Sequence, residues 1–389
     1  MKLVNKNILI ILEYGALGGA QRQALGLANY LSEKNNCKVD LLLIRSCFET
    51  KEFNDFKKKC KIRNTFFLGE PYLFLPYEFT FKNFKRIKWN LQYLLKLRKE
   101  LILYKYEIII PYLNYSSKIA FYLYKLLPTV KSTFWHQLGL DNLKNDIIEK
   151  VAVNNIPFVI GNASNCLSIF ENEYPLPKEK LNLLPQYLTL EFENRNKVEV
   201  LTNLNIPTDV IVIGMIAHYR RDKYFDLVLD AFAMTILKTT KKIHLVLLGN
   251  KGNDEASLNN YQALKSKVEN LNLTAYCHVL SGINVVEILN ILDIAILMSQ
   301  IEGMPNSVME YMSYGIPVIA SNHPGCVHLL DNSKYLIANE VDALELKLLE
   351  LIESDEARMI EGKLNFKRIQ KFNLPSYVEK IEIIFNKYL

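Results

Sequence analysis

The chain has 389 residues, half of them hydrophobic and 23% charged, and its formal net charge is +6. A chain of this length most often makes two domains, and this composition is sufficient for a sizeable core. The sequence excludes a bilayer-spanning segment, because no apolar run approaches the roughly 18–20 residues that such a segment needs. Lys2 and Lys6 before the run ILIIL mimic a signal peptide, but Glu13 ends that run early, and a buried first strand explains it better.

The cysteines give no sign of a metal site or a disulfide framework. They form neither a C-x-x-C pair nor a cysteine–histidine metal spacing, and they are Cys37, Cys47, Cys60, Cys166, Cys277 and Cys326. This scatter predicts reduced thiols in a cytosolic protein.

A glycine-rich turn follows the predicted first strand. Residues 7–13 form that strand, and residues 14–22 lead into an amphipathic helix. Gly18 and Gly19 in the turn would let the backbone approach a ligand closely. The turn is neither the G-x-G-x-x-G dinucleotide fingerprint nor a P-loop. The alternative is a tight turn with a solvent-exposed Arg22.

Further strands at 38–44 and 64–68 precede an unusual segment, residues 72–106, in which aromatic and aliphatic residues are interleaved with cations. The cations are Lys82, Lys85, Arg86, Lys88, Lys96, Arg98, Lys99 and Lys105, and Glu100 is the single acid among them. A basic amphipathic helix with aromatics is typical of a membrane-surface element. The alternative is an ordinary amphipathic helix whose apolar side joins the core and whose basic side is solvated.

A histidine follows the strand that is predicted at 130–135. This places His136 at the carboxyl end of a parallel strand, where we expect its imidazole to face a ligand cleft. The alternative is a hydrogen-bonded structural histidine. Strands at 156–160 and 181–185 then complete the first domain, and the polar stretch 191–198 is the expected hinge.

The second domain opens with a strand at 210–217 and a cationic loop. Arg220, Arg221 and Lys223 place three cations within four residues at the carboxyl end of this strand, which suits a pyrophosphate. The alternative is a solvated basic turn. The next strand, at 243–249, ends at Gly249, and another follows at 277–282.

The stretch 299–321, SQIEGMPNSVMEYMSYGIPVIAS, reads as a loop, a helix and a strand that follow a buried strand of a parallel sheet. Pro305 suits the first helical position. The amides around Asn306, Ser307 and Val308 would then point outward with no intrahelical partner, and Gly303 would allow close approach, so the loop predicts a phosphate site. Glu302 and Glu310 beside this site suggest that the ligand also carries hydroxyl groups, as a sugar does.

The pair Glu302 and Glu310, with GMPN between them and GIPVIAS behind, resembles the E-x7-E signature of the retaining glycosyltransferases of family 4. The resemblance implies an α/β chain with the GT-B fold, in which two Rossmann-like domains with parallel sheets face each other across a cleft. It covers the second domain throughout and the first domain weakly. The implied domains are 1–190 for the acceptor, with a helix at 373–389 packing back on it, and 191–372 for the nucleotide sugar.

The resemblance also implies roles for single residues. Glu302 and His136 would flank the transferred sugar, and Glu310 would bind the ribose hydroxyls. Lys223 matches the lysine of the family, whereas His218 stands where an arginine is usual, so Arg220 or Arg221 would supply the guanidinium. The remaining donor-side positions are Gly18, Gly19, Gly249, Gly303, Met304, Pro305, Asn306 and Ser307.

The sequence therefore predicts a retaining glycosyltransferase that moves a sugar from a nucleotide-diphospho-sugar, UDP-linked, to a hydroxyl of a lipid-linked or oligosaccharide acceptor in surface glycan assembly. No metal is expected, since the D-x-D motif is absent and the family does not require one. Residues 72–106 would hold the protein on the inner face of the cytoplasmic membrane, and no nucleic-acid partner is expected. The alternatives are a nucleotide-sugar epimerase of the same fold and a non-catalytic sugar-nucleotide-binding protein; a glycoside hydrolase does not account for the cationic loop.

Overall fold

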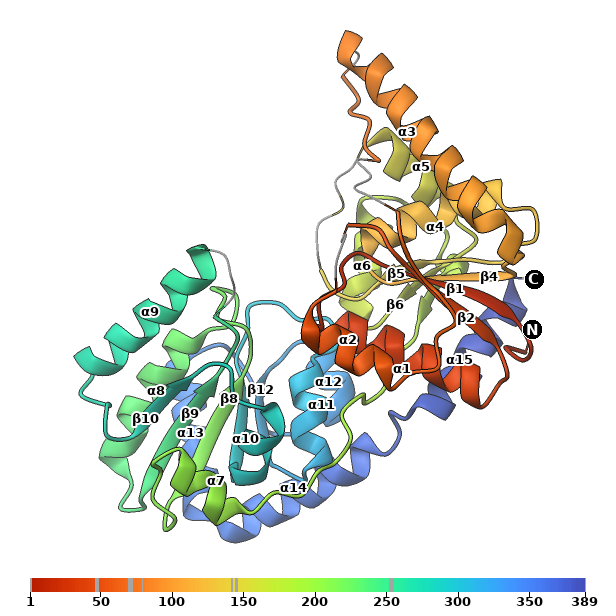
Figure 1. The fold of residues 1–389 in the computed structure, drawn as a ribbon. Helices are drawn as coiled ribbons and strands as arrows, with labels where there is room; N and C mark the ends of the chain where they lie inside the picture. Colours follow the sequence, from red (N-terminus) through yellow and green to blue (C-terminus); the bar gives the residue numbers. More distant parts are fainter. Residues whose placement is uncertain are drawn as a thin grey trace. The chain divides into compact units, whose positions relative to one another are not determined.

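The computed structural model describes residues 2–45, 49–68, 73–78, 80–140, 143, 146–251 and 255–388. They form two compact units: unit 1 consists of residues 1–189 and 373–389, and unit 2 of residues 190–372 (Figure 1). Of the expectations above, Cys47, Tyr72, Phe79 and Leu389 lie outside the described residues.

Unit 1 contains two parallel sheets. The first has the strand order β3-β2-β1-β4, from β1 (Asn7–Leu12), β2 (Lys38–Leu43), β3 (Thr65–Phe67) and β4 (Ile108–Pro111). The second has the order β5-β6-β7, from β5 (Trp135–Gln137), β6 (Val159–Gly161) and β7 (Leu181–Leu183). An isolated bridge between Ile108 and Ser132 places the chain just before β5 beside β4. The strand order therefore reverses between β1 and β4, which makes that point the topological switch of the unit.

The helices of unit 1 cover both faces of its first sheet. They are α1 (Gly19–Glu33), α2 (Lys51–Lys58), α3 (Phe81–Leu101), α4 (Asn114–Leu126), α5 (Ile147–Asn155), α6 (Ser164–Asn172) and α15 (Leu374–Lys387), with 3-10 turns at Ile102–Tyr104 and Lys178–Lys180. In β1, Ile8 and Ile10 pack in the cluster that contains residues of α1 and α15, whereas Leu9 and Ile11 pack with residues of α3 and α4. Burial on both faces explains why this strand is an unbroken apolar run.

The C-terminal helix α15 packs on unit 1. Phe385 lies 5.9 Å from Phe134 and 5.7 Å from Phe158 between ring centroids. The amide of Leu3 donates to Glu382 Oε1 at 2.6 Å. These contacts join the two ends of the chain in one core.

Unit 2 has one six-stranded parallel sheet in the order β10-β9-β8-β11-β12-β13. The strands are β8 (Ile211–Ile216), β9 (Ile243–Leu248), β10 (Cys277–Leu280), β11 (Ile294–Leu297), β12 (Val318–Ser321) and β13 (Leu336–Ile337). The helices are α7 (Lys197–Asn203), α8 (Phe225–Lys238), α9 (Glu255–Asn270), α10 (Val285–Ile291), α11 (Asn306–Ser313), α12 (Pro324–Leu330), α13 (Val341–Glu353) and α14 (Asp355–Ile369). This is the doubly wound Rossmann order, with its switch between β8 and β11. The α/β fold class predicted from the sequence is confirmed.

Two local expectations need correction. The strand expected at 130–135 begins only at Trp135, so His136 lies inside β5 rather than after it. The polar stretch expected as a hinge is bound to unit 2: the amide of Glu193 donates to Tyr314 Oη at 3.1 Å and that of Arg195 to Asn290 Oδ1 at 2.9 Å. Its last residues already belong to α7.

Within the described ranges, no helix combines the length and the hydrophobicity that a membrane crossing requires.

Candidate active site

The candidate site lies at the switch point of unit 2, where the loops after β8 and β11 meet. The two strands pair only at Ile213 and Gly214 of β8. Further along β8 the Ile216 amide donates instead to the hydroxyl of Tyr311 in α11, at 2.6 Å. Beyond the strand ends, the Gln300 amide donates to Asp222 O at 2.7 Å and joins the two loops. Open parallel sheets bind ligands at the carboxyl ends of their strands, at the point where the strand order reverses.

An ion pair between Lys223 and Glu302 lies at the centre of the site. The ammonium of Lys223 donates a short hydrogen bond to Glu302 Oε1, and Asp222 Oδ2 lies 3.4 Å from the same nitrogen. Lys223 is only 8% exposed. Because a buried cation is costly unless it is paired, the carboxylates fix the lysine where the two loops meet. The sequence predicted both residues as site members but gave no sign that they contact each other.

The two neighbouring arginines differ. Arg220 binds Asp222 through two hydrogen bonds, Nε to Oδ1 at 2.9 Å and Nη2 to Oδ2 at 2.7 Å. Burial would raise the pKa of Asp222, but the hydrogen bonds from Arg220 and the charge of Lys223 outweigh it, so this pKa lies below its usual value. Arg221 is exposed and makes no ion pair within the described part of the chain. The two arginines therefore differ in that Arg220 is paired with a carboxylate in the ligand-free protein and Arg221 is not; which of them contacts a ligand stays a prediction.

The N-terminus of α11 supplies a second element with positive electrostatic potential. The sequence suggested that Pro305 is the first residue of this helix. In the structure Pro305 is instead the N-cap of α11. The first hydrogen bond of the helix runs from Met309 N to Pro305 O at 3.4 Å, so the amides of the preceding positions, including Asn306 and Ser307, point out of the helix end. The N-cap residue, a proline, has no side chain that could cap this end. Such a terminus binds phosphate through its amides and its dipole.

Glu310 lies on the same helix, more than one turn from its start. The residue is 4% exposed. An ionised carboxylate on this helix is suited to accept hydrogen bonds from the hydroxyl groups of a ligand.

The loop that carries Glu302 is packed against α12 without intervening side chains. A Cβ built on Gly325 would lie 1.5 Å from Gly303 O and 3.1 Å from Met304 Cα. Cys326 is fully buried next to this contact; burial raises the pKa of its thiol, and the charge of Glu302 raises it further. The position of Gly303 and Met304 thus depends on a glycine in the neighbouring helix.

A polar cluster at the ends of β11 and β12 was missed by sequence reasoning. The carbonyl of Ser299 accepts from Asn339 Nδ2 at 2.9 Å and lies 2.7 Å from His323 Nε2, while Ser321 Oγ donates to Asn339 Oδ1 at 2.5 Å. A run of small and polar residues follows β11 and another follows β12, and these runs were the sequence pattern that could have predicted the cluster. These contacts hold the start of the Glu302 loop in place.

The cationic loop is anchored by an aromatic side chain. Tyr219 is fully buried, and its hydroxyl lies 2.8 Å from Leu247 O and 2.7 Å from Leu280 O. A Cβ on Gly249 would lie 2.4 Å from Ala217 O and 2.8 Å from the Tyr219 ring, so this glycine is required for packing. Its predicted contact with a ligand, like that of the exposed His218, stays a prediction.

In unit 1, His136 is enclosed by its own unit. It is 2% exposed, its Nδ1 lies 2.9 Å from Pro111 O, and the rings of Tyr112 and Phe134 pack against it at 5.0 and 5.3 Å. Burial lowers its pKa to about 4, against a small opposing effect of the Pro111 carbonyl, so the imidazole is neutral. These contacts fit the structural alternative, and the role beside a sugar stays a prediction.

The predicted glycine turn of unit 1 forms the start of α1. Gly18 is its N-cap in an extended conformation, with φ of −133°, and Gly19 is its first residue. Neither glycine has a positive φ. These observations do not test whether the two glycines contact a ligand. They show that a left-handed backbone conformation is not the reason for glycine at either position.

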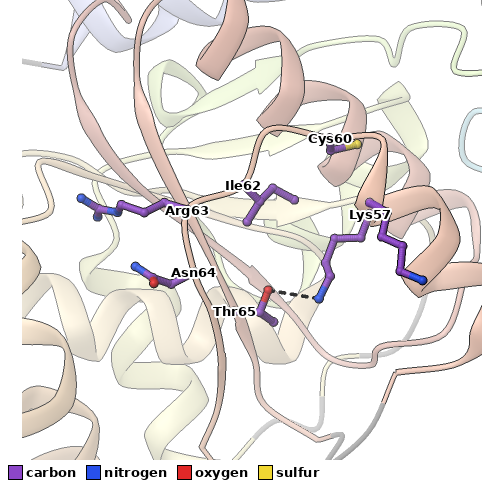
Figure 2. A pocket seen from close by; sticks show the side chains of 7 residues that line it. Lys57, Cys60, Ile62, Arg63, Asn64 and Thr65 are labelled. Carbon is purple, nitrogen blue, oxygen red and sulfur yellow. Dashed lines mark hydrogen bonds between the residues drawn. The ribbon is translucent and has the colours of Figure 1, made fainter.

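Unit 1 has a separate hollow of about 240 Å³ that is lined in part by lysine and arginine side chains (Figure 2). It lies between the end of α2 and the start of β3. Arg63 binds Asp40 in a forked pair, and Lys57 binds Glu49 and lies 3.4 Å from Thr65 Oγ1. These cations are already neutralised, so we do not place the site here. Among the described residues, no group of three or more His, Cys, Asp or Glu side chains could hold a metal ion.

The fold and the loops of unit 2 define a class: a two-unit α/β protein of the GT-B type. Solved structures support the fold. The chain matches a glycosyltransferase from Rickettsia africae with a TM-score of 0.76 at 17% identity, over 99% of this chain and 98% of that one. It matches Anabaena Alr3699/HepE in complex with UDP and glucose with a TM-score of 0.73 at 14% identity, over 98% and 99%.

The sequence comparisons point to one family. Residues 196–365 match the family model described as "Glycosyl transferases group 1". Over 214 residues the chain is 28% identical to an N,N'-diacetylbacillosaminyl-diphospho-undecaprenol alpha-1,3-N-acetylgalactosaminyltransferase from Campylobacter jejuni, which covers 52% of each chain. The chain thus aligns with about half of that relative's length. The predicted resemblance to glycosyltransferases is confirmed at the level of the group 1 match; family 4 and the E-x7-E motif stay predictions.

Proposed function

We propose that the protein is a retaining glycosyltransferase that moves a sugar from a UDP-linked donor to a hydroxyl of a lipid-linked saccharide in glycan assembly. The observation that carries the proposal is the constellation at the switch point of unit 2. There the buried Lys223–Glu302 pair lies at the loop that leads to the uncapped N-terminus of α11, and the same helix carries Glu310. The group 1 match covers all of these residues.

The donor site works by stabilising charge on the departing diphosphate. Lys223 and the first amides of α11 are donors fixed before the reaction, and such donors are effective because they need no reorganisation when charge develops. The exposed Arg221 would add a further cation to the diphosphate. Glu302 holds Lys223 in the ligand-free protein. When a diphosphate binds, the ammonium is shared between the carboxylate and a phosphate oxygen, which leaves Glu302 beside the sugar. Glu310 accepts from the ribose hydroxyls.

The acceptor side of the proposal rests on α3, which extends away from the sheet of unit 1 (Figure 1). The buried residues in the first half of α3 are polar, namely Asn83 and Asn90. Those near its end are apolar, namely Leu97 and Leu101. Six other large apolar side chains of this helix are exposed, namely Phe81, Phe84, Ile87, Trp89, Leu91 and Leu95. The alternative, in which the apolar side joins the core, therefore does not describe the first half of this helix.

Exposed aromatics beside Lys82, Lys85 and Lys88 fit the interface of an anionic membrane, where each cation contributes about 1 kcal/mol. The name of the Campylobacter relative includes a diphospho-undecaprenol, a lipid carrier. Both observations support a lipid-linked acceptor and a location on the inner face of the cytoplasmic membrane.

The donor site is tested by titrating UDP into the wild type and into Glu310→Ala. If the carboxylate binds the ribose, the variant should bind about 10- to 100-fold more weakly, since hydrogen bonds to a charged group contribute about 1.5–3 kcal/mol. Equal affinity would contradict the assigned role. Incubation with a UDP-sugar alone separates the alternatives: free monosaccharide indicates hydrolysis and an isomerised donor indicates an epimerase.

A further inference from the structure

A tyrosine at the switch point of unit 2 makes a hydrogen bond that a strand would ordinarily make. β8 pairs with β11 at Ile213 and Gly214, and the pairing stops there. The Ala217 amide donates to a carbonyl of β9 at 3.0 Å, and because successive amides of a strand point to opposite sides, the Ile216 amide points towards β11. It donates there to the hydroxyl of Tyr311 at 2.6 Å. A side chain of α11 thus replaces the missing strand partner.

The gap between the two strands requires a side chain with a polar tip. Tyr311 is fully buried and Ile216 is 8% exposed, so an Ile216 amide without a partner would be costly. A phenylalanine would fill the same volume and leave this amide unpaired. Burial raises the pKa of Tyr311 well above its usual value, and hydrogen bonds from the Ile216 amide and the Ser307 side chain oppose this only in part. The phenol therefore stays neutral.

Tyr311 connects the two halves of the candidate donor site. Ile216 is the last residue of β8, which leads into the loop that carries Lys223, and Ser307 belongs to the first turn of α11. The hydroxyl of Tyr311 interacts with both Ile216 and Ser307. α11 has only eight residues, and a helix this short takes its position from tertiary contacts rather than from its own stability. The hydroxyl therefore helps to fix the helix end relative to the lysine loop.

We propose that Tyr311 is a positioning residue of the donor site, whose hydroxyl aligns the N-terminal amides of α11 with Lys223 so that both reach the same diphosphate. The inference rests on the proposed function, because it presupposes that a nucleoside diphosphate binds between these two loops. It deepens that function by adding a residue that touches no ligand. Loss of the hydroxyl should therefore matter only while both halves of the site are intact.

The experiment is a double-mutant cycle, in which UDP is titrated into the wild type, Tyr311→Phe, Lys223→Ala and the double variant. Removal of the hydroxyl should weaken UDP binding about 10-fold in the wild-type background, as expected when one buried hydrogen bond that orders the site is lost. In the Lys223→Ala background the same change should cost less than about threefold, because residues that act together are not additive. A merely structural role would give the same factor in both backgrounds.

Tyr335→Phe is the matched control. Tyr335 is a buried tyrosine of the same unit, and its hydroxyl donates to Glu350 Oε1 at 3.0 Å. The variant loses a comparable buried hydrogen bond and should bind UDP like the wild type. The melting temperatures of all variants show which of them are folded.

A measurement on the wild type tests the inference even if Tyr311→Phe does not fold. UDP should slow hydrogen exchange of the Ile216 amide more than that of the Ala320 amide, which bonds to Tyr335 O at 3.0 Å in the same sheet. Equal slowing of both amides overturns the inference, as does an additive cycle or wild-type UDP affinity in folded Tyr311→Phe. If the wild type binds no UDP, the proposed function fails instead, which separates the two failures.

Discussion

The residue that joins the parts of the candidate donor site is Lys223. It is nearly inaccessible, yet its ammonium contacts Glu302 and lies near Asp222. A buried ion pair contributes little net stability, because desolvation offsets the attraction. The pair is therefore better explained by the need to hold a cation ready for an anion than by stability.

Lys223→Ala should lower kcat for sugar transfer by about 10²- to 10³-fold, the usual cost of removing one fixed donor that stabilises developing charge. The KM for the donor should change less, because the amides of α11 still hold the ground-state diphosphate. Steady-state kinetics with a saturating acceptor measure both constants. Lys241→Ala, at an exposed lysine of the same unit, is the control. A kcat within twofold of wild type in Lys223→Ala would contradict this mechanism.

His136 gives unit 1 a pH-dependent stability. Its folded pKa is about 4, against an ordinary value of 6.5, because burial disfavours the charged imidazole. Between these values the unfolded chain binds a proton that the folded chain does not, so stability falls as the pH falls from 6.5 to 4. A difference of about 2.5 pH units corresponds to about 3 kcal/mol.

We therefore expect His136→Gln to show a flatter loss of stability over this range than the wild type, even if it is less stable at pH 7. Denaturant unfolding followed through the fluorescence of the adjacent, buried Trp135 measures it. His278, whose pKa is also about 4, titrates in both proteins and cancels in the comparison. Parallel curves for the two proteins would show that the imidazole of His136 is not held neutral.

At the scale of elements, the donor site depends on how closely α12 approaches the loop before α11. Gly325 meets the backbone of Gly303 and Met304 directly. No rotamer change can relieve a clash with backbone, so this contact transmits any change in α12 to the loop that carries Glu302.

Gly325→Ala should accordingly destabilise unit 2 by about 1–3 kcal/mol, as overpacking usually does, and should also weaken UDP binding, because the shift displaces the N-terminus of α11. Thermal melting with and without UDP measures both effects. Gly139→Ala is the control, since no atom lies within 4 Å of a Cβ built there. A variant that melts and binds UDP like the wild type would show that the loop adapts freely.

The elements could be predicted from periodicity and turn chemistry, whereas the contacts between the candidate site residues could not; the roles of those residues stay predictions. The apolar run of β1 and the proline and glycine of the loop before α11 are local sequence patterns, and each matches the local structure that forms. The Lys223–Glu302 pair joins residues 79 positions apart, and no local pattern encodes it. The burial of His136 could not be predicted for the same reason. Its imidazole was expected to face a cleft, but the rings of Tyr112 and Phe134 pack against it, and only tertiary packing brings these rings together.

At the scale of the whole molecule, the surface of α3 in unit 1 is unusual, because its exposed face is apolar and basic at once. A water-soluble protein rarely exposes several large apolar side chains along one helix unless the surface contacts a partner. A membrane is the partner that accepts aromatics and cations together.

Replacing Phe84 and Trp89 by serine should therefore reduce binding to vesicles that contain anionic lipid, without changing the affinity for UDP in unit 2. Both side chains are more than half exposed, so their loss should cost the fold little. Vesicle co-sedimentation measures the partition. Leu237→Ser is the matched control, because Leu237 is an 85% exposed apolar residue of unit 2. Binding of the wild type should weaken with salt and on neutral vesicles, since the cations of α3 act through a screened field. Vesicle binding that is equal in the double variant and the wild type would place the membrane contact elsewhere.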